Sequence, residues 1–346
     1  MTPAENWSTH LVATAVSRAL GLGAAVQERP PLSFQSNQLF DVWQNGRHYI
    51  AKHYLKTDEL ADAPRREFKA LQLLAPMDIA PQPVFYDPAL GPIVIYEFLA
   101  GEMWDRKKPT AVQLQQLADL WLTLNNVPPP GLWLSRGMER SMQDVSAMFH
   151  GHLQNYEEWA TRHFQPGLAS IPQCRALLER LPTILVSFAQ LPEPTLLFCR
   201  ADPRFANVIQ RPDGSLGLVD WEDCGLRDPA RSVADLLTHP NQEDLLSDEE
   251  WDAFLRPYTA QRRKTDPHFN ERVHHYLALF PIFWLLGLLN FGANHARAGN
   301  SLKGWQPNRI PVNIQLRRYL ARATVWPATP TAADLASLAK ISFFPD

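Results

Sequence analysis

Three polar residues in the second half of the chain have the types and spacing that phosphoryl transfer requires. Asp202 is followed five positions later by Asn207, and Asp220 ends the next apolar segment. Transfer of a phosphoryl group from a nucleotide needs one carboxylate beside the acceptor hydroxyl. It also needs an amide and a second carboxylate that hold Mg²⁺ against the phosphates. Kinase chemistry is therefore the leading hypothesis, although Asp202 and Asn207 taken singly would be ordinary turn or cap residues.

A predicted β-hairpin brings the amide and the second carboxylate together. Residues 207–210 alternate as a strand, residues 212–215 (Pro-Asp-Gly-Ser) are a strong turn signal, and residues 216–220 run back. An antiparallel return places Asp220 near Asn207, with two oxygen donors facing one point. An unpaired carboxylate at the end of an apolar strand would be costly, so a cation is the simplest partner. Mg²⁺ favours few carboxylates together with phosphate oxygens and water, which fits one Asp and one Asn.

A lysine in the first part of the chain has a predicted partner on the following helix. Lys52 lies in an apolar strand candidate beside Ile50 and Tyr54, and taken alone it would extend to solvent. In the functional interpretation Lys52 contacts the nucleotide phosphates, and Glu67 pairs with it and fixes its position. A strand lysine, a helix glutamate and then an acidic hairpin is the order that a two-lobed kinase requires. The combination favours the functional interpretation.

The elements expected to position these residues divide the chain near Gly101. Residues 1–100 are strand-rich with one helix, and they are predicted to form an N-terminal nucleotide-binding lobe. The first two strands flank Asn45-Gly46, the strongest short hairpin signal, and the helix begins near Pro64, a favoured first-turn residue. The expected strands are residues 39–43, 48–52, 84–86 and 93–99, and the expected helix ends near Ala75.

Residues 101–346 are predicted to form a larger helical C-terminal lobe that holds the catalytic loop and the acceptor site. Thr110 and Ser247 each open a capping-box pattern. Further helices are expected at residues 142–162, 172–190, 230–238, 247–262 and 267–297, with the acidic hairpin as an island of strand among them. The predicted fold class is α+β, with a small antiparallel-sheet lobe, a helical lobe, and a cleft between them where a small ligand binds.

The composition is that of an ordinary soluble globular protein, with 45% hydrophobic and 20% charged residues. A net charge of -3 gives no electrostatic case for nucleic-acid binding. Three cysteines without metal-ligand spacing, and a first segment without a basic-then-apolar run, favour a reducing cytoplasm. The apolar run at residues 276–292 contains Pro281, and it is predicted to be a buried helix rather than a membrane span. No membrane partner is expected.

Several motifs follow one another in order between about residue 20 and residue 300. They are Ser36-Asn37, Lys52, Glu67, Tyr96–Gly101, Asp202-x-x-x-x-Asn207, Val219-Asp220-Trp221-Glu222, and Gly225-x-x-Asp228-Pro229-Ala230-x-x-x-x-Asp235. This series resembles the aminoglycoside phosphotransferase and choline kinase family, a small-molecule branch of the protein-kinase-like fold. The block from residue 199 to residue 235 is the most specific part of the resemblance.

The resemblance implies a function and a set of site residues. The function would be transfer of the γ-phosphate of ATP, with Mg²⁺, to a hydroxyl group of a small molecule. Asp202 would be the catalytic carboxylate, and Asn207 and Asp220 would bind Mg²⁺. The implied nucleotide-binding residues are Ser36, Asn37, Lys52 at the phosphates, Glu67 as its partner, and Glu97, Phe98 and Leu99 as a hinge whose backbone meets the adenine. Asp228 and Asp235 would be structural.

The sequence departs from the family pattern at two places. The family usually has a histidine two positions before the catalytic aspartate, whereas this chain has Arg200. Arg200 could brace the loop by hydrogen bonding to the Asp220 region, or it could mark altered or lost activity. The expected phosphate-covering loop, residues 31–37, has no glycine, so it offers fewer backbone N–H groups to phosphate.

The residues after Asp220 are candidates for acceptor binding. Trp221, Glu222 and Asp223 combine an aromatic ring with carboxylates, which suits a cationic amine through charge pairing and cation–π contact. In the alternative interpretation Trp221 packs in the core and Glu222 faces water. The expected partner is a small hydroxyl compound such as an amino alcohol or an aminosugar.

Two other functions stay open at the level of the sequence. A non-catalytic nucleotide- or ligand-binding module of the same fold would account for Arg200 and the loop without glycine. A metal-dependent hydrolase would use Asp220, Glu222 and Asp223. The hydrolase hypothesis leaves the strand lysine, its helix partner and the hinge segment unexplained.

Overall fold

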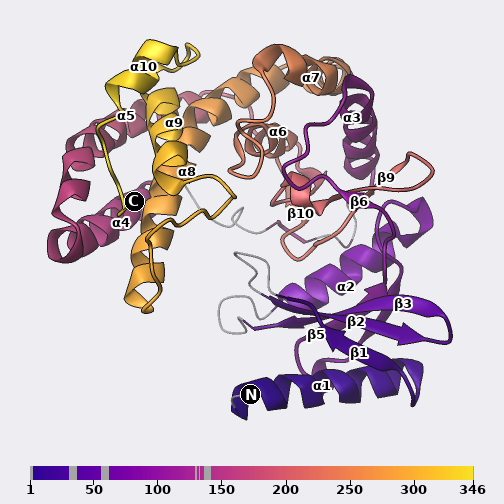
Figure 1. Ribbon diagram of the computed structural model, residues 1–346. Coiled ribbons are helices and arrows are strands. Elements are labelled where there is room, and N and C mark those ends of the chain that lie inside the picture. Colours follow the sequence, from indigo (N-terminus) through magenta and orange to yellow (C-terminus); the bar gives the residue numbers. More distant parts are fainter. Residues whose placement is uncertain are drawn as a thin grey trace. The chain divides into compact units, whose positions relative to one another are not determined.

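The computed structural model of the chain describes residues 3–30, 37–55, 62–128, 131, 133–135 and 142–345 (Figure 1). By their mutual contacts the residues form two compact units, the first Met1–Arg136 with Phe198–Gly225 and the second Gly137–Leu197 with Leu226–Asp346. The segment that carries Asp202, Asn207 and Asp220 therefore belongs to the same unit as Lys52 and Glu67. The lobe boundary near Gly101 is a different division of the chain, and it stays a prediction.

The first unit is built on a five-stranded antiparallel sheet with the strand order β1-β2-β3-β5-β4. The strands are β1 (Ala25–Glu28), β2 (Asn37–Gln44), β3 (Arg47–Tyr54), β4 (Pro83–Tyr86) and β5 (Ile93–Glu97). The predicted hairpin is confirmed, because β2 and β3 pair along their whole length. Its turn residues Asn45 and Gly46 have φ values of 51° and 74°, the conformation whose twist matches the paired strands.

Helix α1 (Pro3–Leu20) covers one face of this sheet, and it was not predicted. Val12 and Val16 are buried against strand residues that include Ala51. Residues two apart on a strand share a face, so Ala51 points toward α1 while Lys52 points to the other face. Tyr49, two positions before Ala51, lies in the same core cluster.

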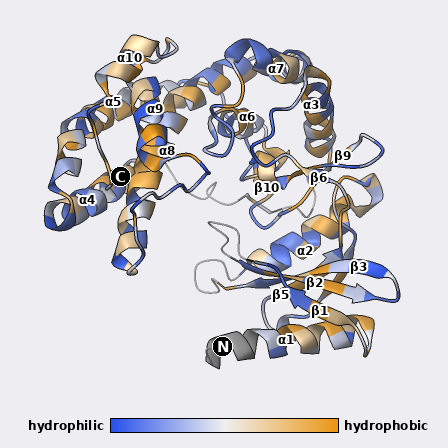
Figure 2. Ribbon diagram, viewed as in Figure 1, coloured by the Kyte–Doolittle hydropathy of each residue, from blue (hydrophilic) through white to orange (hydrophobic). Residues whose placement is uncertain are grey.

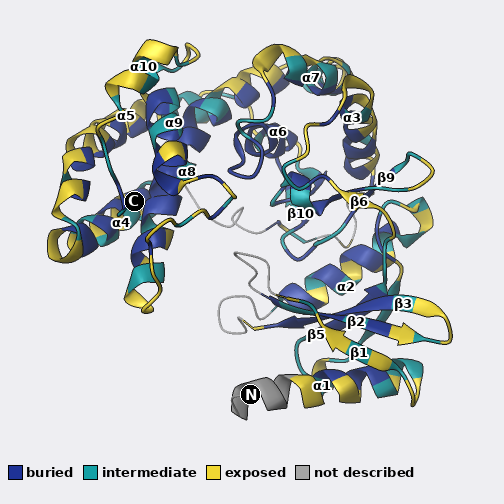
Figure 3. Cartoon of the chain, in the orientation of Figure 1, coloured by how far each residue is buried: buried dark blue, intermediate teal, exposed yellow. Residues whose placement is uncertain are grey.

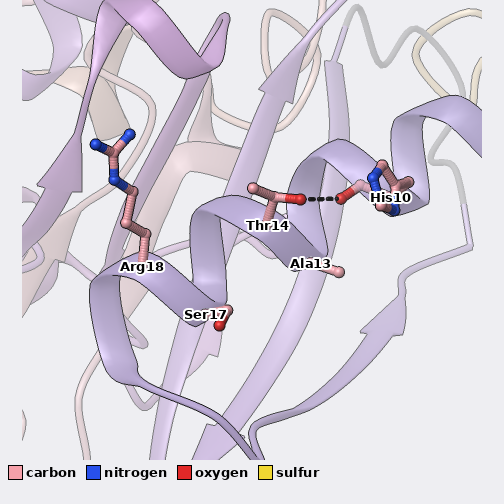
Figure 4. Close-up of a pocket in the computed structure, with 5 residues that line it drawn as sticks. All are labelled: His10, Ala13, Thr14, Ser17 and Arg18. Atoms are coloured by element: carbon pink, nitrogen blue, oxygen red, sulfur yellow. Dashed lines mark hydrogen bonds between the residues drawn. The ribbon is translucent and has the colours of Figure 1, made fainter.

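The outer side of α1 carries a shallow hollow (Figure 4). Thr14 Oγ1 donates to the backbone oxygen of His10 at 2.9 Å, so this hydroxyl is satisfied within the helix. Arg18 forms a surface ion pair with Asp87 at 3.0 Å. The hollow is lined by His10, Ala13, Thr14, Ser17 and Arg18. Its lining includes none of the predicted site residues.

Helix α2 (Ala63–Leu74) places Glu67 inside the first unit. Pro64 lies in its first turn, as predicted, and the buried side of the helix includes Glu67, Leu71 and Leu74. Two short 3-10 helices follow, η1 (Ala75–Met77) and η2 (Pro88–Leu90). A glutamate among leucines on the buried side needs a partner, and the partner is described below.

A three-stranded sheet in the order β6-β8-β9 carries the acidic hairpin. In this sheet Val208 pairs with Leu218, and Gln210 pairs with Leu216, so the predicted hairpin is confirmed. The strands are β6 (Glu102–Met103), β8 (Val208–Gln210) and β9 (Leu216–Leu218). Helix α3 (Ala111–Asn125), which begins with the predicted capping box at Thr110, contacts β9.

Both hairpin strands are shorter than predicted. Asn207 ends the 3-10 helix η4 (Phe205–Asn207) instead of starting β8. Asp220 lies beyond β9 with a left-handed backbone, φ 68°. A non-glycine residue rarely adopts this conformation, so the strand alternation ends before Asp220.

The second unit is helical, and the five helices predicted beyond residue 140 are confirmed. They are α4 (Met142–His163), α5 (Ile171–Ala189), α6 (Pro229–Thr238), α7 (Asp248–Arg262) and α8 (Phe269–Arg297). The predicted capping box at Ser247 is present. Three further helices were not predicted: η3 (Gln165–Ser170), α9 (Val312–Val325) and α10 (Ala332–Ser337). Two strands were also not predicted, β7 (Leu197–Cys199) and β10 (Gly225–Arg227), and each of these strands has residues in both units.

Helix α8 is, among the described residues, the one helix long and apolar enough to cross a membrane. Of its most apolar stretch 61% is buried, and Figures 2 and 3 show apolar and buried residues along it. Leu285, Leu286 and Leu289 lie in the core that α8 shares with α4, α5 and α9. The predicted buried helix is thus confirmed as a core element. The α+β class, an antiparallel sheet followed by a helical part, is also confirmed.

Candidate functional site

Lys52 on β3 is the centre of a buried group of charges in the first unit. Its side chain is 4% exposed, and its Nζ atom lies 2.7 Å from Glu67 Oε2 and 2.5 Å from Asp220 Oδ1. A third carboxylate, Glu222, lies 3.0 Å from the same nitrogen. Sequence analysis predicted the Lys52–Glu67 pair and the position of Asp220 near the phosphates. The structure brings all three residues together in one unit.

The carboxylates around Lys52 keep its ammonium charged in the interior. Burial favours the neutral amine, but Asp220 and Glu67 outweigh it and hold the pKa of Lys52 well above its ordinary value. The Tyr54 hydroxyl donates to Glu67, and its ring lies 4.8 Å from the Lys52 ammonium. The N–H of Trp221 donates to the other oxygen of Glu67, Oε1, at 3.3 Å, so three donors fix Glu67, and Glu67 in turn sets the position of the lysine.

Asp220 and Asn207 are neighbours across the acidic hairpin. The N–H of Val219 donates to the backbone oxygen of Asn207 at 3.1 Å, and this bond holds the backbone before Asp220 beside Asn207. Burial raises the pKa of Asp220, but the Lys52 ammonium outweighs it and leaves the pKa below its ordinary value. Asp220 is thus an ionised carboxylate, with 32% of its side chain exposed.

The amide of Asn207 fits a cation-binding role. Asn207 is 7% exposed, and its Nδ2 atom is buried with no hydrogen-bond partner in the described part of the chain. Buried polar groups are normally satisfied, so this donor indicates a missing acceptor, such as a phosphate oxygen, whereas a cation would be bound by the amide oxygen Oδ1. One ligand oxygen from each of Glu67, Asp220 and Glu222 also lies within 4.8 Å of the others. This donor set suits a hard divalent cation such as Mg²⁺.

Asp202 lies in the loop before the hairpin with a left-handed backbone, φ 56°. Arg204 contacts its carboxylate, with Nε 3.0 Å from Oδ2 and 3.2 Å from Oδ1. The Asp202 side chain is 24% exposed, so a substrate hydroxyl can reach it. Sequence analysis did not identify Arg204, although its place two residues after Asp202 was a usable signal.

Arg200 braces the loops that carry both aspartates, as one of the two interpretations of this residue expected. It is 3% exposed and donates to the backbone oxygens of Asp202 at 3.4 Å and Asp220 at 3.2 Å, and also to that of Val219. Its guanidinium lies 5.2 Å from the ring centre of Trp221. Left-handed aspartates persist only where their surroundings hold them, and Arg200 supplies that support to both.

Glu222 is buried, not solvent-facing, and it links the turn after β9 to the start of β2. It accepts a hydrogen bond from Asn37 Nδ2 at 2.8 Å. Burial raises the pKa of Glu222 to about 7. Trp221 is fully buried and donates from Nε1 to Leu218 O at 3.0 Å, so it packs in the core. Asp223 is half-buried.

The predicted hinge follows β5. The N–H of Phe98 donates to His48 O at 3.0 Å, and the two rings stack at 4.1 Å. Glu97 pairs with Arg47 at the surface. A Cβ added at Gly217 would lie 2.6 Å from Leu99 Cδ2, so the Leu99 side chain lies directly against Gly217 of β9 and would have to shift for a larger residue. Ser36, with the rest of the predicted phosphate-covering loop before Asn37, lies outside the described residues.

The arrangement was compared with known proteins. A model of the APH phosphotransferase enzyme family matches residues 28–272, more than two thirds of the chain. The chain belongs to this phosphotransferase family. The matched part of the chain includes Lys52 and Glu67 as well as the acidic hairpin. A search of curated proteins finds no match.

Solved structures similar to this chain include small-molecule kinases. The choline kinase LicA from Streptococcus pneumoniae is 18% identical, with a TM-score of 0.60 over 92% of this chain and 100% of that one. A choline/ethanolamine kinase family protein from Mesorhizobium loti is 16% identical, with a TM-score of 0.61 over 98% and 99%. Spectinomycin phosphotransferase, in complex with ADP and spectinomycin, is 12% identical, with a TM-score of 0.61 over 96% and 98%. These similarities show the protein-kinase-like fold.

Proposed function

We propose that this phosphotransferase moves the γ-phosphoryl group of ATP to a hydroxyl group of a small molecule. The observation that carries the proposal is the buried Lys52 ammonium, which contacts Glu67 of α2 and Asp220 of the acidic hairpin. Membership of a phosphotransferase family supports the reaction class. The similar spectinomycin phosphotransferase was solved with ADP, which supports an adenine nucleotide as donor.

The nucleotide would be held by residues from the N-terminal part of the chain. Lys52 would bind its phosphates, and Ser36 and Asn37 would close over them. The backbone of residues 97–99 would meet the adenine. In this proposal residues 1–100 are the nucleotide-binding lobe, and residues 101–346 carry the catalytic loop and the acceptor site.

The reacting groups would be positioned by the loop and hairpin that Arg200 braces. Asp202 would orient the acceptor hydroxyl and take its proton as the oxygen–phosphorus bond forms. Lys52 would neutralise negative charge on the phosphates. Asn207 and Asp220 would hold Mg²⁺, which would supply further positive charge to the phosphate oxygens when bound.

The acceptor would be a small hydroxyl compound with a cationic amine, such as an amino alcohol or an aminosugar. The carboxylates of Glu222 and Asp223 support a cationic group, by charge pairing. Choline/ethanolamine kinases and a spectinomycin phosphotransferase are among the structural neighbours, which supports a panel of such acceptors. Trp221 is left out of this acceptor site because its side chain is fully buried.

The test is product formation across a panel of amino alcohols, aminosugars and nucleosides with Mg²⁺ and ATP. With an active acceptor, Asp202→Ala should abolish turnover and spare nucleotide binding. Asp252→Ala is a matched control, because Asp252 is exposed and pairs with Arg256 one helical turn away. Turnover that survives in the Asp202 variant would remove the assigned role of this carboxylate.

A second candidate is a nucleotide-binding protein of the same fold that does not transfer phosphate. The observation that favours it is that the charged groups already have partners within the chain: three carboxylates surround Lys52, and Asn37 donates a hydrogen bond to Glu222. Thermal stabilisation by Mg²⁺ and ATP, with no product from any acceptor, would favour this candidate. The hydrolase hypothesis loses support, because Asp220 and Glu222 both contact Lys52.

A further inference from the structure

Two arginines flank Asp202, and their surroundings differ. Arg200 is buried, and its hydrogen bonds go to backbone oxygens of the two loops. The side chain of Arg204 is 36% exposed, and its hydrogen bond goes to the Asp202 carboxylate. Arg200 therefore holds the backbone, whereas Arg204 acts on the carboxylate expected to face the acceptor.

Most of the hydrogen-bonding capacity of Arg204 is uncommitted. A guanidinium has five N–H donors in a fixed fork. The Nε–H of Arg204 is used by Asp202, and its two Nη groups make no hydrogen bond to any residue that the structure describes. These Nη groups are suited to two parallel bonds with the oxygens of a phosphoryl group, which is the geometry that arginine recognises best.

The neighbouring carboxylates of Asp202 and Asp220 attract the Arg204 guanidinium. The Asp202 carboxylate raises the pKa of Arg204 above its ordinary value, and Asp220 adds to this effect. Lys52 lies on the Asp220 side of the same group of carboxylates. The site thus has one cation associated with Asp220 and a second associated with Asp202.

We propose that Arg204 is a catalytic residue that binds the phosphoryl group during its transfer. This inference rests on the proposed function. As the bond between the γ-phosphorus and the bridging oxygen breaks, the electron pair leaves with the nucleoside diphosphate. The acceptor oxygen bonds to phosphorus, and its proton passes to Asp202. Negative charge spread over the three phosphoryl oxygens is stabilised by the Nη groups of Arg204, while its Nε–H holds the Asp202 carboxylate in place.

Arg204→Gln removes the charge and the fork, and Arg204→Lys restores the charge alone. We expect kcat to fall on the order of 100-fold or more in the glutamine variant, the usual loss when one donor to developing charge is removed. The lysine variant should recover part of that loss. Arg18→Gln is the matched control, since Arg18 is a surface arginine paired with Asp87. Thermal unfolding of each variant verifies that it is folded.

Binding of a transition-state mimic separates catalysis from structural support. ADP alone and ADP with Mg²⁺ and aluminium fluoride are titrated calorimetrically into each protein. Arg204→Gln should bind ADP within about 3-fold of the unmodified chain and should lose at least about 10-fold affinity for the fluoride complex.

The possible outcomes bear on different claims. Equal affinity of the unmodified and glutamine proteins for the fluoride complex, with unchanged kcat, would overturn the role of Arg204 and leave the proposed function standing. Equal loss of ADP and fluoride-complex affinity would show a structural residue and also overturn the role. An unmodified chain that neither transfers phosphate nor binds the fluoride complex would overturn the proposed function, and the role of Arg204 with it.

Discussion

Lys52→Met tests whether one ammonium is the shared counter-charge of three acids. The Nζ atom lies 2.5 Å from Asp220, 2.7 Å from Glu67 and 3.0 Å from Glu222. Methionine keeps most of the apolar stem and removes the charge, so the packing changes little and the electrostatics change completely. The variant therefore isolates the contribution of the ammonium to the stability of the first unit.

The burial of each acid sets the expected magnitude. The Glu67 side chain is 1% exposed, whereas Asp220 is 32% exposed and is reached by water, so the loss falls mainly on Glu67. Removing one partner of a buried ion pair costs about 3–5 kcal/mol, because an uncompensated charge stays in the interior. We expect a loss of this size in the free energy of unfolding at neutral pH.

The sign of the pH dependence follows from the carboxylates left behind. Lys52 lowers the pKa values of Asp220 and Glu222, so these values rise when the ammonium is removed, and the native state of the Lys52 variant then binds protons more tightly than the unfolded state. Stability from such groups is present at low pH and is lost as the pH rises through the raised pKa. The deficit of Lys52→Met should therefore be smaller in acid than at neutral pH.

The assay is urea unfolding followed by circular dichroism, within a double-mutant cycle. In Lys52→Met/Glu67→Leu the most deeply buried of the three acids is removed together with the ammonium, and we expect the double variant to recover at least about 2 kcal/mol relative to the sum of the single variants. Lys107→Met is the control, since Lys107 pairs with exposed Glu102 and should cost less than about 1 kcal/mol. Additive effects of the two buried substitutions would refute the shared-charge reasoning.

Two further predictions concern other buried charges. Arg200→Met leaves the backbone oxygens of Val219 and Asp220 without this donor, so urea unfolding should show a loss of about 1–3 kcal/mol. Glu243 is buried, and burial raises its pKa to about 7, against an ordinary value of 4.5. Its contribution to the stability of the folded state is therefore fully present below pH 4.5 and is lost as the pH rises through 7. The stability of Glu243→Gln relative to the unmodified chain should therefore increase by up to about 3 kcal/mol across that interval, and a constant difference would contradict the raised pKa.

Local signals in the sequence were sufficient for most elements near the site. Asn45-Gly46 predicts the β2–β3 hairpin because few residue pairs adopt two positive φ values easily. The capping boxes at Thr110 and Ser247 mark helix starts through bonds between residues three apart. Helix α1 was missed because its buried positions include the small residue Ala15, which gives a weak apolar stripe.

The surroundings of Trp221 and Glu222 could not be predicted from the sequence. Strand alternation places Trp221 and Glu222 on opposite faces, one buried and one in water, yet both are buried. The left-handed backbone at Asp220 breaks the alternation, and Trp221 then begins a turn in which its oxygen accepts from Cys224 N at 3.2 Å. The contact of Glu222 with Asn37 spans 185 positions of the chain, so no local pattern encodes it.

The charges around Lys52 explain why the site residues must act together. One ammonium faces three carboxyl groups, so acidic groups are in excess around Lys52. Burial raises the pKa of Glu222 to about 7, and the carboxylates of Asp220 and Glu67 add to this shift, so the ligand-free chain holds this excess at a cost. A divalent cation beside Asn207 and Asp220 would balance this excess of acidic groups. Phosphate oxygens would then replace the carboxylates as partners of the Lys52 ammonium. The same group of carboxylates that destabilises the ligand-free chain would thus give it affinity for a metal–nucleotide complex.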